Sequence, residues 1–290
     1  MPDLPLRILT YNIRHYTPEP FPGELPWKDR AQPLINQLRH ITHGHADALV
    51  CLQEVFHSQL DDIVAGINAN AGSDPWSYIG VGRDDGHQAG EYSPIFYRAS
   101  QWTPRFTKTI WLSETPGVPS KGWDADSIRL ATIAVLQHRT TGHSVLAVNT
   151  HLDDQGSRAR LEGARLILRT VGACRGGDGG VCAESISGVF VAGDMNSEEH
   201  QEAYVAFTTE GQKGESKLVD AATMVPVAEH HGNRITWTGF GSEVEDPAVL
   251  DYVFLGGKWT VDGYAVLANG FDDGVLISDH RPVVVDVRLA

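Results

Sequence analysis

Cysteine is scarce in this chain of 290 residues, which contains only Cys51, Cys174 and Cys182. Three cysteines cannot close a disulfide framework, and these three lack the CxxC spacing of a structural zinc site. We expect reduced thiols, although Cys174 and Cys182 flank a glycine-rich segment and can pair under oxidising conditions. The cysteine content therefore excludes a small scaffold stapled by disulfides.

Long apolar runs are absent as well. No stretch reaches the ~18 consecutive apolar residues of a membrane span. The first residues, Met1 to Pro5, have neither the basic region nor the apolar core of a secretion signal. We therefore expect a cytoplasmic protein that does not contact a membrane. No feature of the sequence indicates an obligate protein partner.

Basic residues are few: Lys and Arg number 23 against 37 for Asp and Glu, which gives a net charge of −14. Such a surface repels a polyanion at long range. A long nucleic acid is therefore an awkward partner, unless a local basic strip or bound divalent cations reverse the sign inside one cleft. The hydrophobic content of 41% is ordinary for a folded protein and excludes collagen, coiled coil and wholesale disorder.

Short apolar runs, several of them rich in Val and Ile, predict β-strands along the whole chain. They cover residues 6–13, 48–53, 93–97, 128–137, 144–150, 186–192, 248–255 and 282–287. After Ser157, apolar residues recur at three- and four-residue intervals from Leu161 to Val171, which predicts a helix capped by that serine. Ser197, followed by two glutamates, is a second signal for the start of a helix.

The predicted strands and helices mix without the strict alternation of a barrel or a Rossmann domain, which favours a mixed α/β sandwich. The one segment that resembles a linker, residues 172–184, contains five glycines and lies between a predicted helix and a predicted strand. We interpret it as a surface loop rather than a domain boundary. Residues 1–290 are therefore predicted to form a single domain.

Polar residues suited to metal or phosphate chemistry stand at the ends of six predicted strands. A rigid sheet holds such groups in the crevice beyond its edge, where α/β proteins place their sites. Each residue alone has an ordinary explanation, because Asp and Asn often cap turns and a histidine beside a strand is often a hydrogen-bonded core residue. Repetition at six strand ends instead predicts a shared cluster, whose members are Asn12, Glu54, His151, Asp194, Asn196, Asp251, Asp279 and His280.

The motifs around these residues, taken in order, resemble the endonuclease/exonuclease/phosphatase family of metal-dependent phosphoesterases, the DNase I-like proteins. They are Tyr11-Asn12-Ile13, Leu52-Gln53-Glu54-Val55, Asn149-Thr150-His151-Leu152, Ala192-Gly193-Asp194-Met195-Asn196, Leu250-Asp251-Tyr252-Val253-Phe254 and Ser278-Asp279-His280-Arg281-Pro282. The resemblance implies a four-layer α/β/β/α sandwich with two mixed β-sheets. Residues 91–97, 111–116 and 120–124 further resemble a microbial subgroup described only as metal-dependent hydrolases.

The resemblance also implies a metal side of the site. Glu54 supplies a hard carboxylate oxygen suited to Mg²⁺ or Mn²⁺. Asn12 shares that site or holds the ligand in place, and Asp279 resembles a further carboxylate on the metal side. Asp194 resembles the residue that acts as base or orients water, and Asn196 the residue that binds the phosphate or holds the nucleophile.

Two histidines, His151 and His280, resemble the pair that contacts the scissile phosphate and donates hydrogen bonds or a proton as charge develops. Asp251 resembles the carboxylate that pairs with His280, raises its pKa and fixes its orientation. By its position before a predicted strand, Glu91 resembles the acid that pairs with His151. The alternative for Glu91 is a solvated glutamate in a turn.

Four further residues are candidates for substrate binding. Arg129 and Arg160 have the geometry to clamp a phosphate, or else form surface ion pairs. Asp153 projects near His151 if the strand continues, or caps the following helix. Trp123 either stacks on a base or sugar or is buried. Loops 14–30, 83–92, 113–127 and 228–247 are expected to choose the substrate.

These observations favour a Mg²⁺- or Mn²⁺-dependent phosphoester hydrolase that uses in-line attack by water on a small or modest phosphorylated molecule. A nuclease, either DNase-like or an RNA 3′-exonuclease such as a deadenylase, is the first alternative. The densest basic stretch, residues 158–169, has only four arginines on different helix faces, which is little for tracking a nucleic-acid backbone. A catalytically inactive binding module is the least favoured, because every expected metal and base residue is present.

Overall fold

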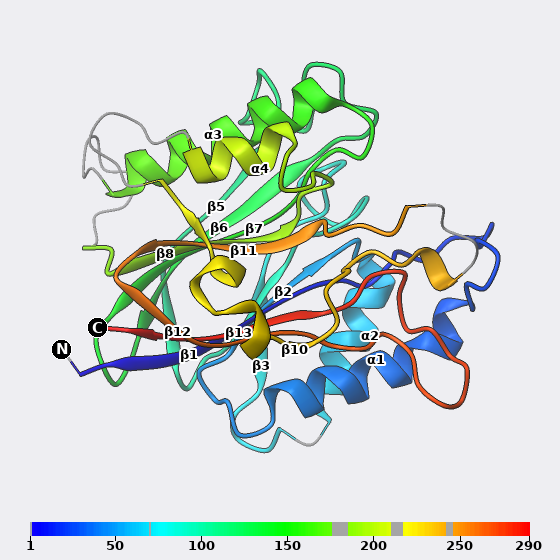
Figure 1. The fold of residues 1–290 in the computed structure, drawn as a ribbon, viewed down its shortest axis with the longest axis horizontal. Helices are drawn as coiled ribbons and strands as arrows, with labels where there is room; N and C mark the ends of the chain where they lie inside the picture. The colour runs from blue at the N-terminus through cyan, green and yellow to red at the C-terminus, as the bar shows by residue number, and fades with distance from the viewer. Residues whose placement is uncertain (1, 70, 176–184, 210–216, 242–245) are drawn as a thin grey trace.

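The computed structural model describes residues 2–69, 71–175, 185–209, 217–241 and 246–290. Two mixed β-sheets lie face to face in it, and helices cover their outer faces (Figure 1). The sheets are mixed because parallel pairs, such as β1 with β2 and β7 with β8, stand among antiparallel ones. The predicted four-layer α/β/β/α sandwich is therefore confirmed.

One sheet has seven strands in the order β10-β12-β13-β1-β2-β4-β3. Its strands are β1 (Leu4–Asn12), β2 (Leu49–Gln53), β3 (Trp76–Ile79), β4 (Ile95–Arg98), β10 (His231–Gly232), β12 (Trp259–Val266) and β13 (Val283–Leu289). The other sheet has six strands in the order β5-β6-β7-β8-β11-β9. Its strands are β5 (Trp102–Trp111), β6 (Leu130–His138), β7 (Ser144–His151), β8 (Gly188–Asp194), β9 (Val219–Asp220) and β11 (Asp251–Gly257).

Helices α1 (Trp27–Thr42) and α2 (His57–Asn68) pack on the seven-stranded sheet, and α3 (Ser157–Arg175) and α4 (Glu202–Thr209) on the six-stranded one. Short 3₁₀ turns are η1 (Ala221–Met224), η2 (Val227–Glu229) and η3 (Gly239–Gly241). Three hydrophobic cores result, one between the sheets and one under each helical layer. None of the helices in the described ranges is long and apolar enough to cross a membrane.

Side chains along β1 alternate between the core that lies between the sheets and the core under α1. Leu6 and Ile8 pack into the core between the sheets, whereas Leu9 and Tyr11 pack into the core under α1. Because successive side chains of a strand point to opposite faces, Asn12 shares the inner face with Ile8. The strand therefore ends with an amide aimed between the two sheets.

All eight predicted strands are present, with ends that differ by a few residues. The helix after Ser157 is confirmed as α3, but the carboxylate of Asp124 accepts the N–H groups of Arg158 and Ala159 at its start, at 3.3 and 2.7 Å. The predicted helix start at Ser197 is wrong by several residues, because α4 begins only at Glu202. The Ser197 hydroxyl still accepts an N–H group from the first turn of that helix.

Two other expectations are corrected. Residues 172–184 were interpreted as a loop, but α3 includes residues 172–175. Residues 176–184 lie outside the described ranges. Cys51 is a buried free thiol. Cys174 is disulfide-bonded, so the expectation of a reduced thiol is wrong there, and Cys182 lies outside the described residues.

Candidate active site

The predicted cluster forms because several strands end at one edge of the double sheet. In the six-stranded sheet, His151 pairs with Asp194 and Asp194 pairs with Asp251, so three strands place their functional residues in one row. Gly193 allows the close approach of β8 to β7, because its φ is 148° and a Cβ there would collide with the carbonyl of Thr150. The chain therefore brings the three side chains together through backbone pairing alone.

A cavity of about 770 Å³ lies at this edge. Seven of the nine residues predicted for catalysis or metal binding line it: Glu54, Glu91, His151, Asp194, Asn196, Asp279 and His280. Two others are fully buried directly behind its wall, where Asn12 contacts Glu54 and Asp251 contacts His280. The cluster that the strand ends predict is therefore a single site.

Unusual backbone conformations help to aim these side chains. Glu54 and Asn196 have φ angles of 58° and 44°, in the left-handed region that costs energy for residues other than glycine. The carboxylate of Asp194 accepts the N–H group of Asn196 at 2.9 Å and so closes the turn after β8. Such strain is concentrated at functional positions in many proteins.

On the side predicted to bind metal, the Asn12 amide links two carboxylates. Its Nδ2 donates to Glu54 Oε1 at 2.9 Å and to Asp194 Oδ2 at 3.0 Å. Burial alone would raise the pKa of Glu54, but a hydrogen bond from His15 and the charges of His15 and Arg14 hold that pKa well below its usual range. Glu54 is therefore an ionised hard oxygen donor that faces the cavity.

Burial disfavours the ionised form of two further carboxylates, Asp194 and Asp279. Burial, with a smaller contribution from the charge of Asp251, raises the pKa of Asp194 to about 7. Burial also raises the pKa of Asp279, and the charge of Glu54 adds to the effect. A divalent cation among these groups would offset the repulsion, so the donor set fits Mg²⁺ or Mn²⁺.

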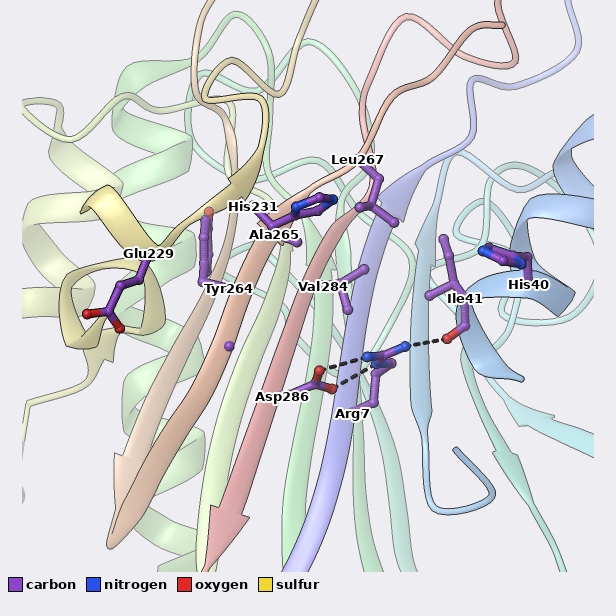
Figure 2. Close-up of a pocket in the computed structure, with 11 residues that line it drawn as sticks. Arg7, His40, Ile41, Glu229, His231, Tyr264, Ala265, Leu267, Val284 and Asp286 are labelled. Carbon is purple, nitrogen blue, oxygen red and sulfur yellow. Dashed lines mark hydrogen bonds and ion pairs between the residues drawn. The ribbon is translucent and has the colours of Figure 1, made fainter. Parts of the chain in front are cut away.

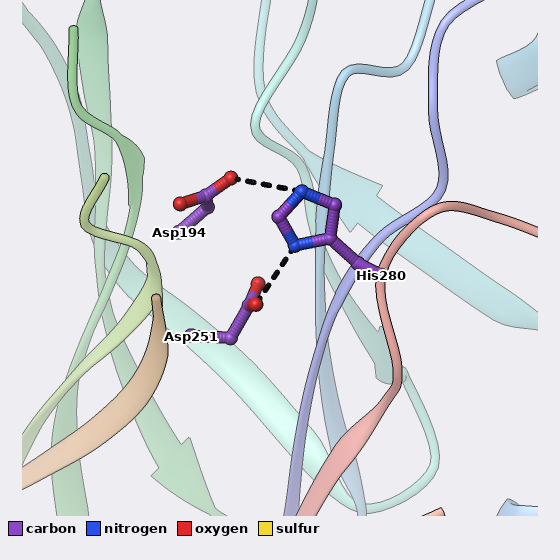
Figure 3. Close-up of side chains that lie close together, drawn as sticks. All are labelled: Asp194, Asp251 and His280. Atoms are coloured by element: carbon purple, nitrogen blue, oxygen red, sulfur yellow. Dashed lines mark hydrogen bonds and ion pairs between the residues drawn. The ribbon is translucent and has the colours of Figure 1, made fainter. Parts of the chain in front are cut away.

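His280 lies between two carboxylates (Figure 3). Its Nδ1 is 2.8 Å from Asp251 Oδ2, and its Nε2 is 3.5 Å from Asp194 Oδ2. Burial would lower the pKa of His280, but Asp251 and Asp194 hold it well above its ordinary value. These three groups are close enough to share a cation. A carboxylate beside each ring nitrogen equally suits a protonated His280 ring, which both carboxylates would stabilise.

His151 has the opposite character. Burial, followed by the charge of Arg129, holds its pKa well below the ordinary value, so the ring is neutral. Its Nε2 lies 3.0 Å from the Asn196 amide nitrogen. Its Nδ1 is 3.8 Å from Glu91, which is buried rather than solvated and is bound instead by Arg83 at 2.8 Å. The two histidines therefore enter the site in different protonation states.

The candidates for substrate binding divide into two pairs. Arg129 and Arg160 both line the cavity, but Arg129 is paired with Asp154 at 2.7 Å and Arg160 with Glu202 at 2.6 Å. Asp153 is buried outside the cavity wall, where it accepts N–H groups from residues 126, 127, 155 and 156. Trp123 is half-buried and does not line the cavity either.

Several lining residues were not predicted from the sequence. Arg14 and His15 follow Asn12 by two and three residues, so the strand-end reasoning that found the asparagine also applies to them. Arg83 lies in a loop and is recognisable only from its ion pair with Glu91. Each of the four loops expected to choose the substrate contributes to the cavity wall.

A second pocket, of about 310 Å³, lies on the outer face of β1, β12 and β13 (Figure 2). Its main charged groups are Arg7 and Asp286, which form two hydrogen bonds of 2.7 Å with each other. Arg7 also donates to the carbonyl of Ile41 at 2.7 Å. Because these groups are already satisfied, the pocket lacks the converging, unneutralised carboxylates of the strand-end cavity.

The fold and the site together define the class of the protein, which is a hydrolase built on a four-layer α/β/β/α sandwich. The chain matches the model of the Endonuclease/Exonuclease/phosphatase family over residues 9–280 and belongs to this family. No curated protein matches the chain in sequence.

Solved structures give the same result. A family protein from Bacteroides vulgatus is 32% identical, with a TM-score of 0.83 over 99% of this chain and 100% of that one. The mannosyl-6-phosphatase Bt3783 of Bacteroides thetaiotaomicron is 28% identical, with a TM-score of 0.79 over 97% of this chain and 99% of that one. D. rerio TDP2, solved with a single-strand DNA product, is 20% identical with a TM-score of 0.67 over 98% of both chains, and shares the fold.

Proposed function

We propose that this protein is a divalent-metal-dependent hydrolase of phosphate esters that acts on small or modest phosphorylated molecules by in-line attack of water. The observation that carries the proposal is the gathering of Glu54, Asp194, His151 and His280 around one cavity. Ester hydrolysis needs charge neutralisation on the phosphoryl oxygens, an aligned nucleophile and a proton for the leaving oxygen. The cavity wall contains a side chain suited to each of these three requirements.

The ion would be held by Glu54 and Asp279, with Asn12 fixing the position of Glu54. A bound Mg²⁺ or Mn²⁺ supplies Lewis acidity to the phosphoryl group. Glu54 suits this role because it is ionised, and Asp279 because its burial favours a neighbouring positive charge. Both are hard oxygen donors of the kind that these cations prefer.

The remaining residues act on the water and on the phosphate. Asp194 lies 3.5 to 3.6 Å from both histidines, and its raised pKa of about 7 suits a group that accepts a proton from water. The Asn196 amide and the neutral His151 ring hold the attacking oxygen or a phosphoryl oxygen. The protonated His280 donates to the phosphoryl group and is oriented by Asp251.

Charge supports a small substrate over a nucleic acid. The net charge is −14, and the two arginines expected to clamp a phosphate are paired with acids. The neighbour at 28% identity is a mannosyl-6-phosphatase by name, which is consistent with a phosphorylated small molecule. A nuclease is the second candidate, because divalent cations bound among the carboxylates of the cavity can offset the repulsion locally.

The test is hydrolysis in Mg²⁺ or Mn²⁺, with EDTA controls, across phosphomonoesters, phosphodiesters, single-stranded RNA and plasmid DNA. We expect metal-dependent turnover of small esters that Glu54→Gln and Asp194→Asn each reduce by at least about a hundredfold. Asp262→Asn is the matched control, because this exposed carboxylate pairs with Arg288 far from the cavity. Full activity in both site variants would refute the proposal, and plasmid nicking without turnover of small esters would favour the nuclease.

A further inference from the structure

The active-site cavity changes character between its interior and its mouth. The buried part carries His151, His280 and Arg129, together with the carboxylates of Glu54, Glu91, Asp194 and Asp279. The more exposed part of the wall carries carboxylates, namely Asp126, Asp154, Glu198 and Asp246, of which Glu198 is half-buried and the others are exposed. We call these four residues the acidic rim. A ligand that enters the cavity therefore passes carboxylates that accept hydrogen bonds at the mouth before it reaches the two histidines at depth.

Cations near the rim cancel only part of this charge. Arg129 is held by Asp153 at 3.4 Å and by Asp154 at 2.7 Å. Arg160 is held by Glu202 at 2.6 Å. Glu198, Asp126 and Asp246 have no side-chain partner among the residues that the structure describes. A second phosphate group on the substrate would consequently be repelled at the mouth.

Hydrogen-bonding capacity at the mouth is large and only partly used. Gln201 accepts the N–H group of Glu198 through Oε1 at 2.9 Å, which leaves its amide N–H₂ group available. Gln155 donates to Asp154 at 2.9 Å, which leaves its amide oxygen available. The buried Nη1 of Arg129, a residue that is 6% exposed and lines the cavity, has no partner in the described part of the chain. The wall thus offers both acceptors and donors for an uncharged polar ligand.

These groups adjoin the phosphate side of the site. Glu198 follows Asn196 by two residues, and Asp154 and Gln155 follow His151 by three and four. The cavity of about 770 Å³ has room for a six-membered ring beside a phosphoryl group. Trp237 adds an aromatic surface to the same wall.

We propose that the acidic rim, with Gln155 and Gln201, is a binding site for the hydroxyl groups of a sugar that carries a single phosphate. Carboxylate and amide oxygens accept hydrogen bonds from hydroxyl groups, whereas they repel the phosphates of a polynucleotide. This inference rests on the proposed function and specifies its substrate class. The phosphoryl group lies at depth beside the histidines, and the neutral sugar ring lies at the mouth.

The test compares two phosphomonoesters built on a six-membered ring, glucose 6-phosphate and cyclohexylmethyl phosphate. Both esters have a primary alcohol as leaving group and a six-membered ring, but only the first has hydroxyl groups on that ring. We expect the wild-type protein with Mg²⁺ to show a kcat/KM at least tenfold higher for the sugar phosphate. Mannose 6-phosphate and a short oligonucleotide complete the panel, and the oligonucleotide is expected to be the poorest substrate.

Glu198→Ala is expected to reduce the ratio of the two kcat/KM values about tenfold, mainly through the KM of the sugar phosphate. Glu199→Ala is the matched control, because this neighbouring carboxylate is exposed and lies outside the cavity wall, so the ratio should not change. Gln155→Ala is expected to reduce the ratio of the two kcat/KM values as well, independently of Glu198.

Equal kcat/KM values for the two monoesters in the wild-type protein would overturn this inference and leave the proposed function standing. An equal loss on both esters in Glu198→Ala, or a preference for the oligonucleotide, would overturn it as well. Absence of turnover for every phosphoester in Mg²⁺ and Mn²⁺ would overturn the proposed function itself, and the inference with it.

Discussion

Gln53 and Asn149 belong to different sheets, yet the Gln53 amide donates to Asn149 Oδ1 across the interface at 2.7 Å. Both residues are fully buried. Asn149 in turn donates to the carbonyls of Leu52 and Pro94, each at 2.8 Å. Since Gln53 precedes Glu54 and Asn149 lies two residues before His151, this link fixes the proposed metal side of the site against the proposed phosphate side.

Removing the Gln53 amide should therefore impair both stability and catalysis. Gln53→Met keeps the shape but leaves Asn149 Oδ1 unsatisfied, which we expect to cost about 1–3 kcal/mol of unfolding free energy. A small displacement of Glu54 relative to His151 should lower kcat about tenfold to a hundredfold. Urea denaturation and steady-state kinetics measure the two effects.

Thr132→Val is the control for that variant, because the buried Thr132 hydroxyl in β6 has no partner among the described residues. Its replacement should leave kcat unchanged and stability equal or higher. A Gln53→Met protein that is destabilised but retains its full kcat would show that the link between the sheets is structural only.

Arg30 is fully buried beneath the site and should contribute strongly to stability. Its guanidinium donates to the carbonyls of Ile13 and Ile277 at 3.0 and 2.8 Å, and to that of Leu25 at 2.9 Å. Arg30→Met leaves these carbonyls unsatisfied, so we expect a loss of roughly 3 kcal/mol or more in urea denaturation. Arg288→Met, which removes only an exposed ion pair, should cost much less. Equal losses in the two variants would contradict this account.

Asp220 predicts a pH dependence of stability away from the active site. Burial raises its pKa from 3.8 to about 6, against the hydrogen bonds from the Ala222 N–H group and the Tyr204 hydroxyl. A raised pKa in the folded state means that the contribution of the protonated carboxyl is complete below pH 3.8. It is lost as the pH rises through about 6.

Asp220→Asn cannot ionise; its Oδ1 can still accept the Ala222 N–H group, and its Nδ2 can donate to the Tyr204 hydroxyl oxygen. Its stability relative to the wild-type protein should rise between pH 4 and pH 6 and then level off, with a gain of up to roughly 3 kcal/mol at pH 8. Urea denaturation at pH 4, 5 and 8 measures the difference, with Asp262→Asn as an exposed control. A difference that is constant across this range would contradict the prediction.

Asp251 should act through His280 rather than through the metal. The Asp251 carboxylate lies 2.8 Å from His280 Nδ1 and favours the protonated ring. Asp251→Asn removes this charge, so we expect kcat to fall by about 10²–10⁴-fold. The Mg²⁺ concentration for half-maximal activity should stay within about twofold of the wild-type value. A large increase in that concentration would instead identify Asp194, Asp251 and His280 as a cation site.

The sequence was most informative where short strands end in polar residues. Asn12, Glu54 and Asp194 were predicted from this pattern because the period of a strand fixes which face each side chain takes. Helix α1 was not predicted, since it begins after Pro26 and contains Pro33, so local signals work against it. Its formation depends on packing of its buried face against the seven-stranded sheet.

Ion pairs formed by distant residues were the least predictable part of the site. The pairing of Arg129 with Asp154 decides that this arginine is not a free clamp, and it depends on a loop conformation that no local pattern encodes. Similarly, Asp153 has the right spacing to face the cavity, but it turns away to accept four backbone N–H groups. Loop residues therefore need tertiary structure for their assignment.

The row formed by His151, Asp194 and Asp251 across three paired strands has a consequence for how the protein can be altered. A one-residue slip in any of these strands would turn one of the three side chains to the opposite face. Insertions or deletions in the loops around the cavity leave that pairing intact. Replacing these loops with those of other family members should therefore change the substrate specificity and leave the three paired side chains in place.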